Sequence, residues 1–163
     1  MNPYGPDLGD REPLDALEFV PRDVQELLGR AGPEVYERPL GAGKWTVGQV
    51  LLHLAQTELA FGVRFRLALS TPSYVVQPFD QDAWMAREPE TDGREALGAW
   101  LALRRMNLAL FRSFSAEERA RTFHHPERGD LTIWDYVETL AGHDVHHLVQ
   151  LQALIGGPPA RTP

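Results

Sequence analysis

The sequence predicts an all-α fold in which four main helices form a bundle. Apolar residues recur at helical spacing in four long segments, and proline and glycine interrupt the chain between these segments. No segment alternates convincingly between apolar and polar residues, as a half-buried strand would. The 163 residues, 43% of them hydrophobic, suffice for one domain with a substantial core. We expect this domain over residues 13–157, between a loose lead-in at 1–12 and a C-terminal tail at 158–163.

The first helix is expected to begin near the start of this domain. Its apolar residues are three or four positions apart: Leu14, Leu17, Val20, Val24, Leu27 and Leu28. Pro21 is expected to bend or restart the helix, because proline lacks the N–H that the helix interior needs. Gly32 and Pro33 then end it.

The second helix is predicted to open at a capping box, in which Thr46 caps the first turn and Gln49 completes the motif. We expect this helix to run to about Ser70. Residues 71–93 follow as a long, partly irregular connection between the second and third helices, since they contain three prolines and end in a glycine. Connections of this length are uncommon unless they serve a function.

The third helix is predicted over residues 94–114, and a short turn with its own capping box follows at residues 115–118. A further box, formed by Thr132 and Asp135, opens the last helix. That helix is expected to end at the glycine- and proline-rich run that begins with Gly156.

Charge and composition exclude several functions. Sixteen basic and 23 acidic residues give a net charge of −7, and without a basic cluster the chain is a poor ligand for nucleic acid. No apolar run approaches the ~20 residues that cross a membrane, and the N-terminus lacks a secretory signal, so we expect a cytoplasmic protein. The chain contains no cysteine, so any transition metal must be held by histidine and carboxylate side chains.

The histidines of the second and last helices indicate a metal site. His143 and His147 are four residues apart, which places their side chains on one helix face with Cβ atoms about 5–6 Å apart. His146 points about 100° away from His147 around the helix. His53 lies at the margin of the buried stripe of its helix and can face the pair if the two helices are neighbours. The alternative is a set of core histidines satisfied by hydrogen bonds.

Three imidazoles form an open site, because the remaining coordination positions are left to water or substrate, as in catalytic metal sites. Zn²⁺ suits these ligands, and Ni²⁺ is an alternative because imidazole binds several borderline ions.

Two stretches of sequence around these histidines carry a family resemblance. They are Lys44-Trp45-Thr46 with VLLHLAQTE at residues 50–58, and HPERGDLT at residues 125–132 with GHDVHHLVQ at residues 142–150. In this order and spacing they resemble the signatures of the DinB/YfiT-like superfamily, over nearly the whole chain. The resemblance implies a four-helix bundle with a three-histidine metal site, which carries over to His53, His143 and His147. Gln56 stands where many members carry aspartate; we expect it on the polar side of its helix, away from His53, with no change of ligands.

The resemblance implies three alternative functions. Characterised members include thiol S-transferases that use bacillithiol or mycothiol, in which a metal lowers the pKa of a bound thiol. This chain would take that low-molecular-weight thiol from solution, since it has no cysteine. Other members are called metal-dependent hydrolases, which would use a metal-bound water on a small-molecule substrate. The third alternative is a non-catalytic, stress-linked metal-binding dimer.

Two further features bear on substrate and partner. Asp80 and Trp84 lie in the long connection, in a segment that the resemblance places at the mouth of the metal site; the alternative is an ordinary surface loop with Trp84 in the core. The second helix also carries a second apolar stripe on its back, formed by Leu52, Leu59, Val63 and Leu67. A helix that is apolar on both sides is central or meets a partner, so we predict a homodimer through this stripe.

Three charged residues fall on faces that should be buried. Glu58, Arg104 and Asp144 lie within the apolar stripes of the second, third and last helices. Because an unpaired buried charge costs several kcal/mol or more, we predict a buried polar layer in which Arg104 donates to one or both carboxylates. Beside the metal site, this layer would orient the histidines as a second shell. The alternative is that helix rotation brings one of these groups to solvent.

Overall fold

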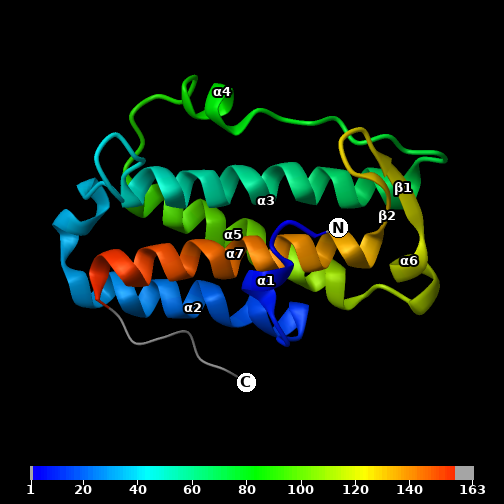
Figure 1. Cartoon of the computed structure of the whole chain (residues 1–163), viewed down its shortest axis with the longest axis horizontal. Helices are drawn as coiled ribbons and strands as arrows, with labels where there is room; N and C mark the ends of the chain where they lie inside the picture. Colours follow the sequence, from blue (N-terminus) through cyan, green and yellow to red (C-terminus); the bar gives the residue numbers. More distant parts are fainter. Residues whose placement is uncertain (1, 157–163) are drawn as a thin grey trace.

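Four long helices lie side by side in the computed structural model, which describes residues 2–156 (Figure 1). They are α2 (Pro13–Ala31), α3 (Val47–Ser70), α5 (Gly93–Arg112) and α7 (Ile133–Ile155). Helix α3 packs mainly against α5, and α2 packs mainly against α7. The predicted four-helix bundle is therefore confirmed. The tail expected at residues 158–163 lies outside the described residues.

The helix ends follow the sequence signals closely. Both predicted side-chain bonds of the capping box are present at Thr46 and at Thr132, which open α3 and α7. Helix α2 continues through Pro21, which is buried, so this proline does not divide the helix. Helix α7 ends at Gly156, whose φ of 79° is in the left-handed region that favours glycine.

Short elements occupy the connections. They are α1 (Gly5–Leu8), the 3₁₀ helix η1 (Pro33–Glu37), α4 (Gln81–Met85), α6 (Ala116–Ala120), and the strands β1 (Thr122–His125) and β2 (Gly129–Thr132). The two strands form an antiparallel hairpin in which Phe123 pairs with Leu131, and both side chains are buried. The sequence did not predict this hairpin, because each strand has only four residues and presents too short an alternation to recognise.

The N-terminal segment corrects the expectation of a loose lead-in. Helix α1 packs against α7, and its residue Leu8 is part of the buried hydrophobic core. The close approach requires a glycine, because a Cβ at Gly142 of α7 would lie only 2.4 Å from the carbonyl oxygen of Tyr4. A four-residue helix rich in proline and glycine has no periodicity, so its packing could not be predicted from the sequence.

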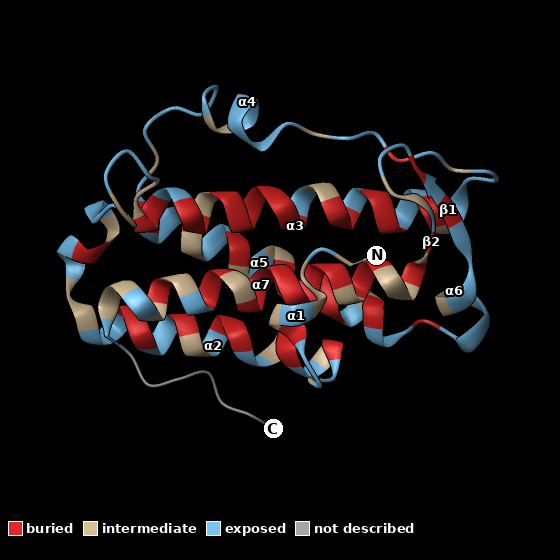
Figure 2. Ribbon diagram, viewed as in Figure 1, coloured by how far each residue is buried: buried red, intermediate tan, exposed pale blue. Residues whose placement is uncertain are grey.

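Buried residues line the facing sides of the four long helices, whereas the connection that carries α4 is mostly exposed (Figure 2). That connection leaves the C-terminal end of α3, meets the hairpin, and crosses back above α3 toward the start of α5 (Figure 1). Its first part is fastened by a backbone bond from the N–H of Val76 to the carbonyl of His124. Within residues 2–156, none of the helices combines the length and the apolar character needed to cross a membrane.

Candidate metal centre

Three buried histidines converge between α3 and α7. The Nε2 atom of His143 lies 3.0 Å from Nε2 of His53 and 3.2 Å from Nε2 of His147. The candidate ligand atoms all lie within 4.8 Å of one another, and all three residues are buried. The structure thus brings together the three histidines that the sequence singled out, because α3 and α7 are neighbours in the bundle.

The donor set fits a transition metal. Burial, followed by the neighbouring imidazole of His143, lowers the pKa of His53 to about 3, and the same two causes lower the pKa of His147 to about 2. Both rings are therefore neutral near pH 7, and a neutral imidazole offers one nitrogen lone pair. Tetrahedral ligands at Zn–N distances of 2.0–2.1 Å would be about 3.3 Å apart. The distances from Nε2 of His143 to Nε2 of His53 and of His147, 3.0 and 3.2 Å, are close to that value.

The orientation of His147 is determined by a chain of hydrogen bonds that begins on its outer nitrogen. Nδ1 of His147 lies 2.9 Å from Oε1 of Gln150, and because an amide oxygen only accepts, Nδ1 must donate. The Gln150 amide nitrogen lies 2.9 Å from Nε2 of His146, to which it donates. Nδ1 of His146 then faces the Asp7 carboxylate at 3.4 Å. This chain leaves the lone pair of His147 on Nε2, where it faces the other two rings.

The other two histidines are oriented by packing. Nδ1 of His53 and Nδ1 of His143 are buried without a hydrogen-bond partner among the described residues. The ring of Trp45 packs against His53 with centroids 5.1 Å apart, and the Tyr4 ring meets His143 edge-on, also at 5.1 Å. The sequence did not predict Tyr4, Gln150 or the supporting role of His146. For Gln150, the three-residue spacing from His147 on one helix was an available signal.

A pocket of about 880 Å³ opens onto the three-histidine centre. His53 and His147 form part of its lining, together with Tyr4, Trp45 and Asp82. Its walls come from the N-terminal segment, the loop before α3, helix α4, and the C-terminal half of α7. A small molecule in this pocket would therefore contact the metal centre directly.

The residues expected at the pocket mouth have other surroundings. Asp80 caps α4, where its Oδ1 accepts from two backbone N–H groups, and Trp84 packs against Phe79 with ring centroids 4.9 Å apart. Their neighbours Gln81 and Asp82 line the pocket instead.

The expectation that Gln56 lies on a solvated face is wrong. Gln56 is buried, and its Nε2 donates to Glu88 Oε1 over 3.0 Å. The long connection reaches over this side of α3, and a helical wheel of one segment cannot show such a cover. No hydrogen bond joins Gln56 to a histidine of the metal centre within residues 2–156.

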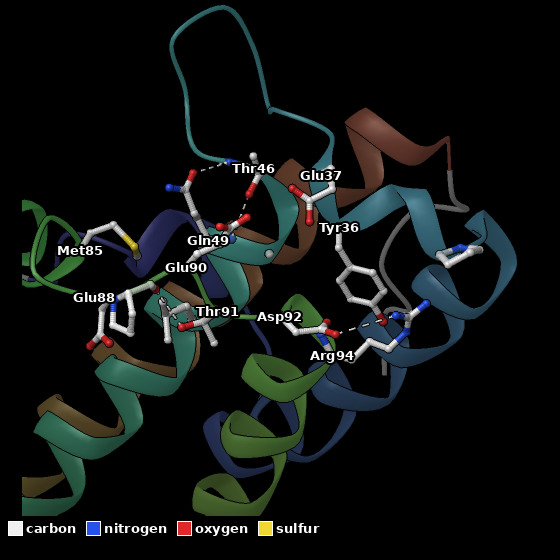
Figure 3. A pocket seen from close by; sticks show the side chains of 14 residues that line it. Tyr36, Glu37, Thr46, Gln49, Met85, Glu88, Glu90, Thr91, Asp92 and Arg94 are labelled. Carbon is white, nitrogen blue, oxygen red and sulfur yellow. Dashed lines mark hydrogen bonds and ion pairs between the residues drawn. The ribbon is translucent and has the colours of Figure 1, made fainter.

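A second pocket, of about 660 Å³, lies away from the histidines, between η1, the start of α3 and the connection before α5 (Figure 3). Four acidic residues line it: Glu37, Glu88, Glu90 and Asp92. Arg94 lies over the Tyr36 ring at 5.4 Å and 3.9 Å from Asp92. None of the histidines described by the structure lines this pocket, so it is separate from the metal centre.

A buried layer of charge links the four long helices. Arg104 of α5 donates from Nε to Glu58 of α3 over 2.8 Å, and from Nη1 to Asp144 of α7 over 2.5 Å. Nη1 also donates to the backbone carbonyl of Leu17 in α2 over 3.1 Å. The side chains of Arg104 and of both carboxylates are at most 3% exposed. The structure thus brings together the three charged residues that the sequence placed on buried faces.

Asn107 completes this layer, although the sequence did not point to it. Its Nδ2 donates to Oε2 of Glu58 over 2.7 Å and to the backbone carbonyl of Glu58 over 3.0 Å. Burial alone would raise the pKa of Asp144, but the adjacent Arg104 guanidinium holds this pKa below its usual value. Both carboxylates therefore share one guanidinium and remain compensated inside the bundle.

The charged layer does not hydrogen-bond to the histidine rings, contrary to the expected second shell. The shortest approach is between Oδ1 of Asp144 and Nδ1 of His143, at 3.8 Å, which is too long for a hydrogen bond. The layer acts on the metal centre through helix position, because Asp144 and His143 are adjacent on α7. Direct orientation of a ring comes from Gln150 instead.

Comparison with known proteins supports the same site. A family model described as the DinB superfamily matches residues 16–151. "Putative metal-dependent hydrolase OB0782" of Oceanobacillus iheyensis is 29% identical over 142 residues, covering 86% of this chain and 83% of that protein. "Putative metal-dependent hydrolase YfiT" of Bacillus subtilis is 26% identical over 144 residues, covering 86% of this chain and 81% of that protein.

A solved structure also matches the fold of this chain. YfiT from Bacillus subtilis superposes with a TM-score of 0.78 and 25% identity, over 90% of this chain and 87% of that one. It is described as "a probable metal-dependent hydrolase with an unusual four-helix bundle topology". The likeness covers all four long helices, since it spans nine-tenths of the chain.

Replacing Arg104 by methionine should destabilise the protein by about 3–5 kcal/mol, because two buried carboxylates would lose their counter-charge. Urea denaturation of the variant and the parent protein measures this difference. Arg105→Met is the matched control, since Arg105 is the next residue of α5 and is exposed; it should change stability by less than about 0.5 kcal/mol. Equal stabilities of the two variants would contradict a structural role for the layer.

Replacing Gln150 by leucine should weaken Zn²⁺ binding about 10- to 100-fold, because His147 Nδ1 would lose the acceptor that keeps its lone pair on Nε2. Titration calorimetry with Zn²⁺ measures the dissociation constant. Gln150→Glu retains an acceptor for His147 and should bind Zn²⁺ more tightly than Gln150→Leu. Gln152→Leu, two residues along the same helix, should leave the affinity unchanged; a loss equal to that of Gln150→Leu would exclude the tautomer explanation.

Proposed function

The chain belongs to the DinB superfamily, and from this premise we propose that it is a metal-dependent hydrolase of a small molecule. The observation that carries the proposal is the convergence of three buried imidazoles beside an open pocket, two of which, His53 and His147, have strongly lowered pKa values. His53, His143 and His147 would hold a divalent metal. Relatives described as metal-dependent hydrolases match more than four-fifths of this chain.

A divalent metal bound by three imidazoles supplies a Lewis acid, which polarises a substrate carbonyl and lowers the pKa of a coordinated nucleophile. The chain's own residues prepare the site for that chemistry. Gln150 keeps the lone pair of His147 on Nε2, and the rings of Trp45 and Tyr4 hold the other two imidazoles in place. The pocket brings the substrate against the open side of the centre and shields part of it from water.

Three imidazoles favour Zn²⁺, and Ni²⁺ is the second choice, because borderline ions prefer nitrogen ligands. No carboxylate lies within ion-pair distance of His53 or His147 among the described residues; Asp144 approaches His143 at 3.8 Å. A donor set without a coordinated carboxylate is a poor match for Mg²⁺ or Ca²⁺, which prefer oxygen ligands.

A thiol S-transferase is a second candidate, which the size of the pocket favours. About 880 Å³ lies near the upper end for a small-molecule site and leaves room for two small reactants. The nucleophile would be an external low-molecular-weight thiol such as bacillithiol, because the chain has no cysteine. In this case His53, His143 and His147 would serve to hold the same metal, and the pocket would orient thiol and electrophile.

We expect Zn²⁺-loaded protein to hydrolyse activated esters or amides without added thiol, as measured by release of a chromogenic leaving group. His53→Ala should abolish this activity together with Zn²⁺ binding, because it removes one of the three ligands. His124→Ala is the control, since this exposed histidine lies outside the centre.

Other outcomes separate the candidates. Consumption of a thiol together with a chlorinated aromatic electrophile, but no ester or amide turnover, would identify the transferase. No turnover in either assay with the metal loaded would contradict both enzymes and favour a non-catalytic metal-binding protein.

We propose in addition that two copies of the chain pair through α3. Leu59, Val63 and Leu67 follow one another at four-residue spacing, and they are 49%, 50% and 38% exposed. Leu52, two turns earlier, is partly buried. A row of large apolar side chains on one exposed helix face is typical of a protein contact.

Sedimentation velocity at micromolar concentration should show a dimer for the parent protein and a monomer for Val63→Lys. Val149→Lys is a matched control, because Val149 is also 50% exposed but lies on α7. A monomeric parent protein, or a dimer that Val63→Lys leaves intact, would contradict pairing through this stripe.

A further inference from the structure

Among the arginines that the structure describes, two are buried, but only one of these has a counter-charge within 4 Å. Arg104 is 3% exposed and contacts two carboxylates. Arg64 of α3 is 7% exposed, and no carboxylate in the described part of the chain lies within 4 Å of its guanidinium. Because buried charges are normally paired, Arg64 is the unusual member of the two.

Neutral groups hold the Arg64 guanidinium in place. Nη1 donates to the hydroxyl of Tyr136 over 2.6 Å, and Nη2 donates to the backbone carbonyl of Gln77 over 2.5 Å. The guanidinium also lies 5.7 Å from the Phe61 ring centroid and 5.1 Å from that of Phe79. These partners fix the orientation of the positive charge without neutralising it. The bond to Gln77 could simply fasten the long connection to α3. That structural role would not need a second positive charge close to Arg64.

Further positive charge is nevertheless present. Arg128, in the turn of the β-hairpin, donates from Nη2 to Thr139 Oγ1 over 3.1 Å. Its Nε is buried and has no hydrogen-bond partner in the part of the chain that the structure describes. Burial, and then the charges of Arg128 and Arg64, lower the pKa of the buried His125. The positive charges of both guanidinium groups are therefore felt at the same two side chains, His125 and Tyr136.

The nearest acidic groups do not neutralise these arginines. Glu127 raises the pKa of His125, but burial and the two arginines outweigh it. Asp135 likewise raises the pKa of Arg128 less than burial lowers it, and its Oδ2 accepts from the backbone and hydroxyl of Thr132. Neither carboxylate forms an ion pair with Arg64 or Arg128 within residues 2–156. We call Arg64, Arg128 and His125 the basic cluster.

The basic cluster lies on the same helix seam as the metal centre. His53 faces His143 at one point of the α3–α7 contact, and Arg64 faces Tyr136 at another. The two helices run in opposite directions, so residues later in α3 and residues earlier in α7 both lie closer to the hairpin (Figure 1). The contact between Arg64 and Tyr136 is therefore nearer to the hairpin than the contact between His53 and His143. Thr139, which contacts Arg128, precedes His143 by four residues, a rise of about 6 Å along α7, and Tyr136 precedes it by seven, about 10 Å.

We propose that Arg64 and Arg128 bind an anionic group of the substrate, a carboxylate or a phosphate, beside the metal centre. This inference rests on the proposed function, and it narrows the substrate to small anionic molecules. The α7 residues that Arg128 and Arg64 contact, Thr139 and Tyr136, precede His143 by helix rises of about 6 and 10 Å. Arg128 is half-buried and open to solvent, so it can meet the anion first, whereas Arg64 offers a preorganised charge below it.

Direct binding of anions tests the cluster independently of catalysis. Metal-free protein at low ionic strength is titrated with inorganic phosphate and, separately, with acetate, by calorimetry. We expect saturable binding of at least one anion, weakened tenfold or more in Arg128→Gln. Arg121→Gln is the control, because Arg121 is an exposed arginine that contacts the carbonyl of Leu69 outside the cluster, and it should bind like the parent protein.

Arg64→Gln tests the second arginine, and circular dichroism reports whether this variant folds. If it does not fold, Arg128→Gln still tests the proposal, because within residues 2–156 the Arg128 side chain makes a single hydrogen bond, to Thr139 of α7, and does not hold α3. No binding of either anion, or equal binding by Arg128→Gln and Arg121→Gln, would overturn the proposal. Preference for phosphate over acetate, or the reverse, identifies the group.

Kinetics separate this proposal from the proposed function. With Zn²⁺ loaded, an anionic ester and its neutral analogue with the same leaving group are compared. We expect Arg128→Gln to raise KM for the anionic ester about tenfold and to leave the neutral ester unchanged. Equal turnover of both esters, with no effect of Arg128→Gln, would retain the hydrolase and refute the anion site. Anion binding that depends on Arg128, without turnover of any ester, would retain the site and refute the hydrolase.

Discussion

The contact between Arg104 and its two carboxylates is the constraint on which the arrangement of the bundle depends. One guanidinium reaches α3 through Glu58, α7 through Asp144 and α2 through a backbone carbonyl. Apolar packing alone tolerates small rotations and shifts of helices, whereas a buried charge must face its partner or bear a large desolvation cost. The layer therefore sets which sides of α3 and α7 face each other. Because His53 and His143 lie on those sides, it also sets the convergence of the metal centre.

Buried polar groups between the helices occur in three places, and they serve a different purpose in each. At the charged layer, opposite charges compensate each other, so the groups are structural. At the metal centre, burial and mutual proximity keep two of the imidazoles neutral, as their low pKa values indicate, and this frees lone pairs for a cation. At the basic cluster, neutral groups orient Arg64, and no carboxylate of residues 2–156 forms an ion pair with it. A cation-binding centre and an excess of positive charge on one seam complement a substrate that carries an anion beside its reactive bond.

Local signals were sufficient to predict the long helices and the histidines. Capping boxes such as Thr46 with Gln49 lie within four residues, and the spacing of His143 and His147 fixes a shared face wherever the helix packs. Features that depend on contacts between distant segments were missed. Gln56 was misplaced because a connection some thirty residues away covers it, and helix α1 was missed because its packing depends on the absence of a side chain at Gly142.

The metal centre serves the function of this protein, because the bundle does not need it in order to fold. The core and the charged layer already join the four long helices without the histidines. Helix α1 adds Leu8 to that core, and the same segment brings Tyr4 against His143 and Asp7 against His146. His146 in turn accepts from the Gln150 amide that orients His147. A segment that also sets the geometry of the histidines is expected when those histidines must be held ready for a ligand. The metal is thus expected to occupy a site that the folded protein has already organised.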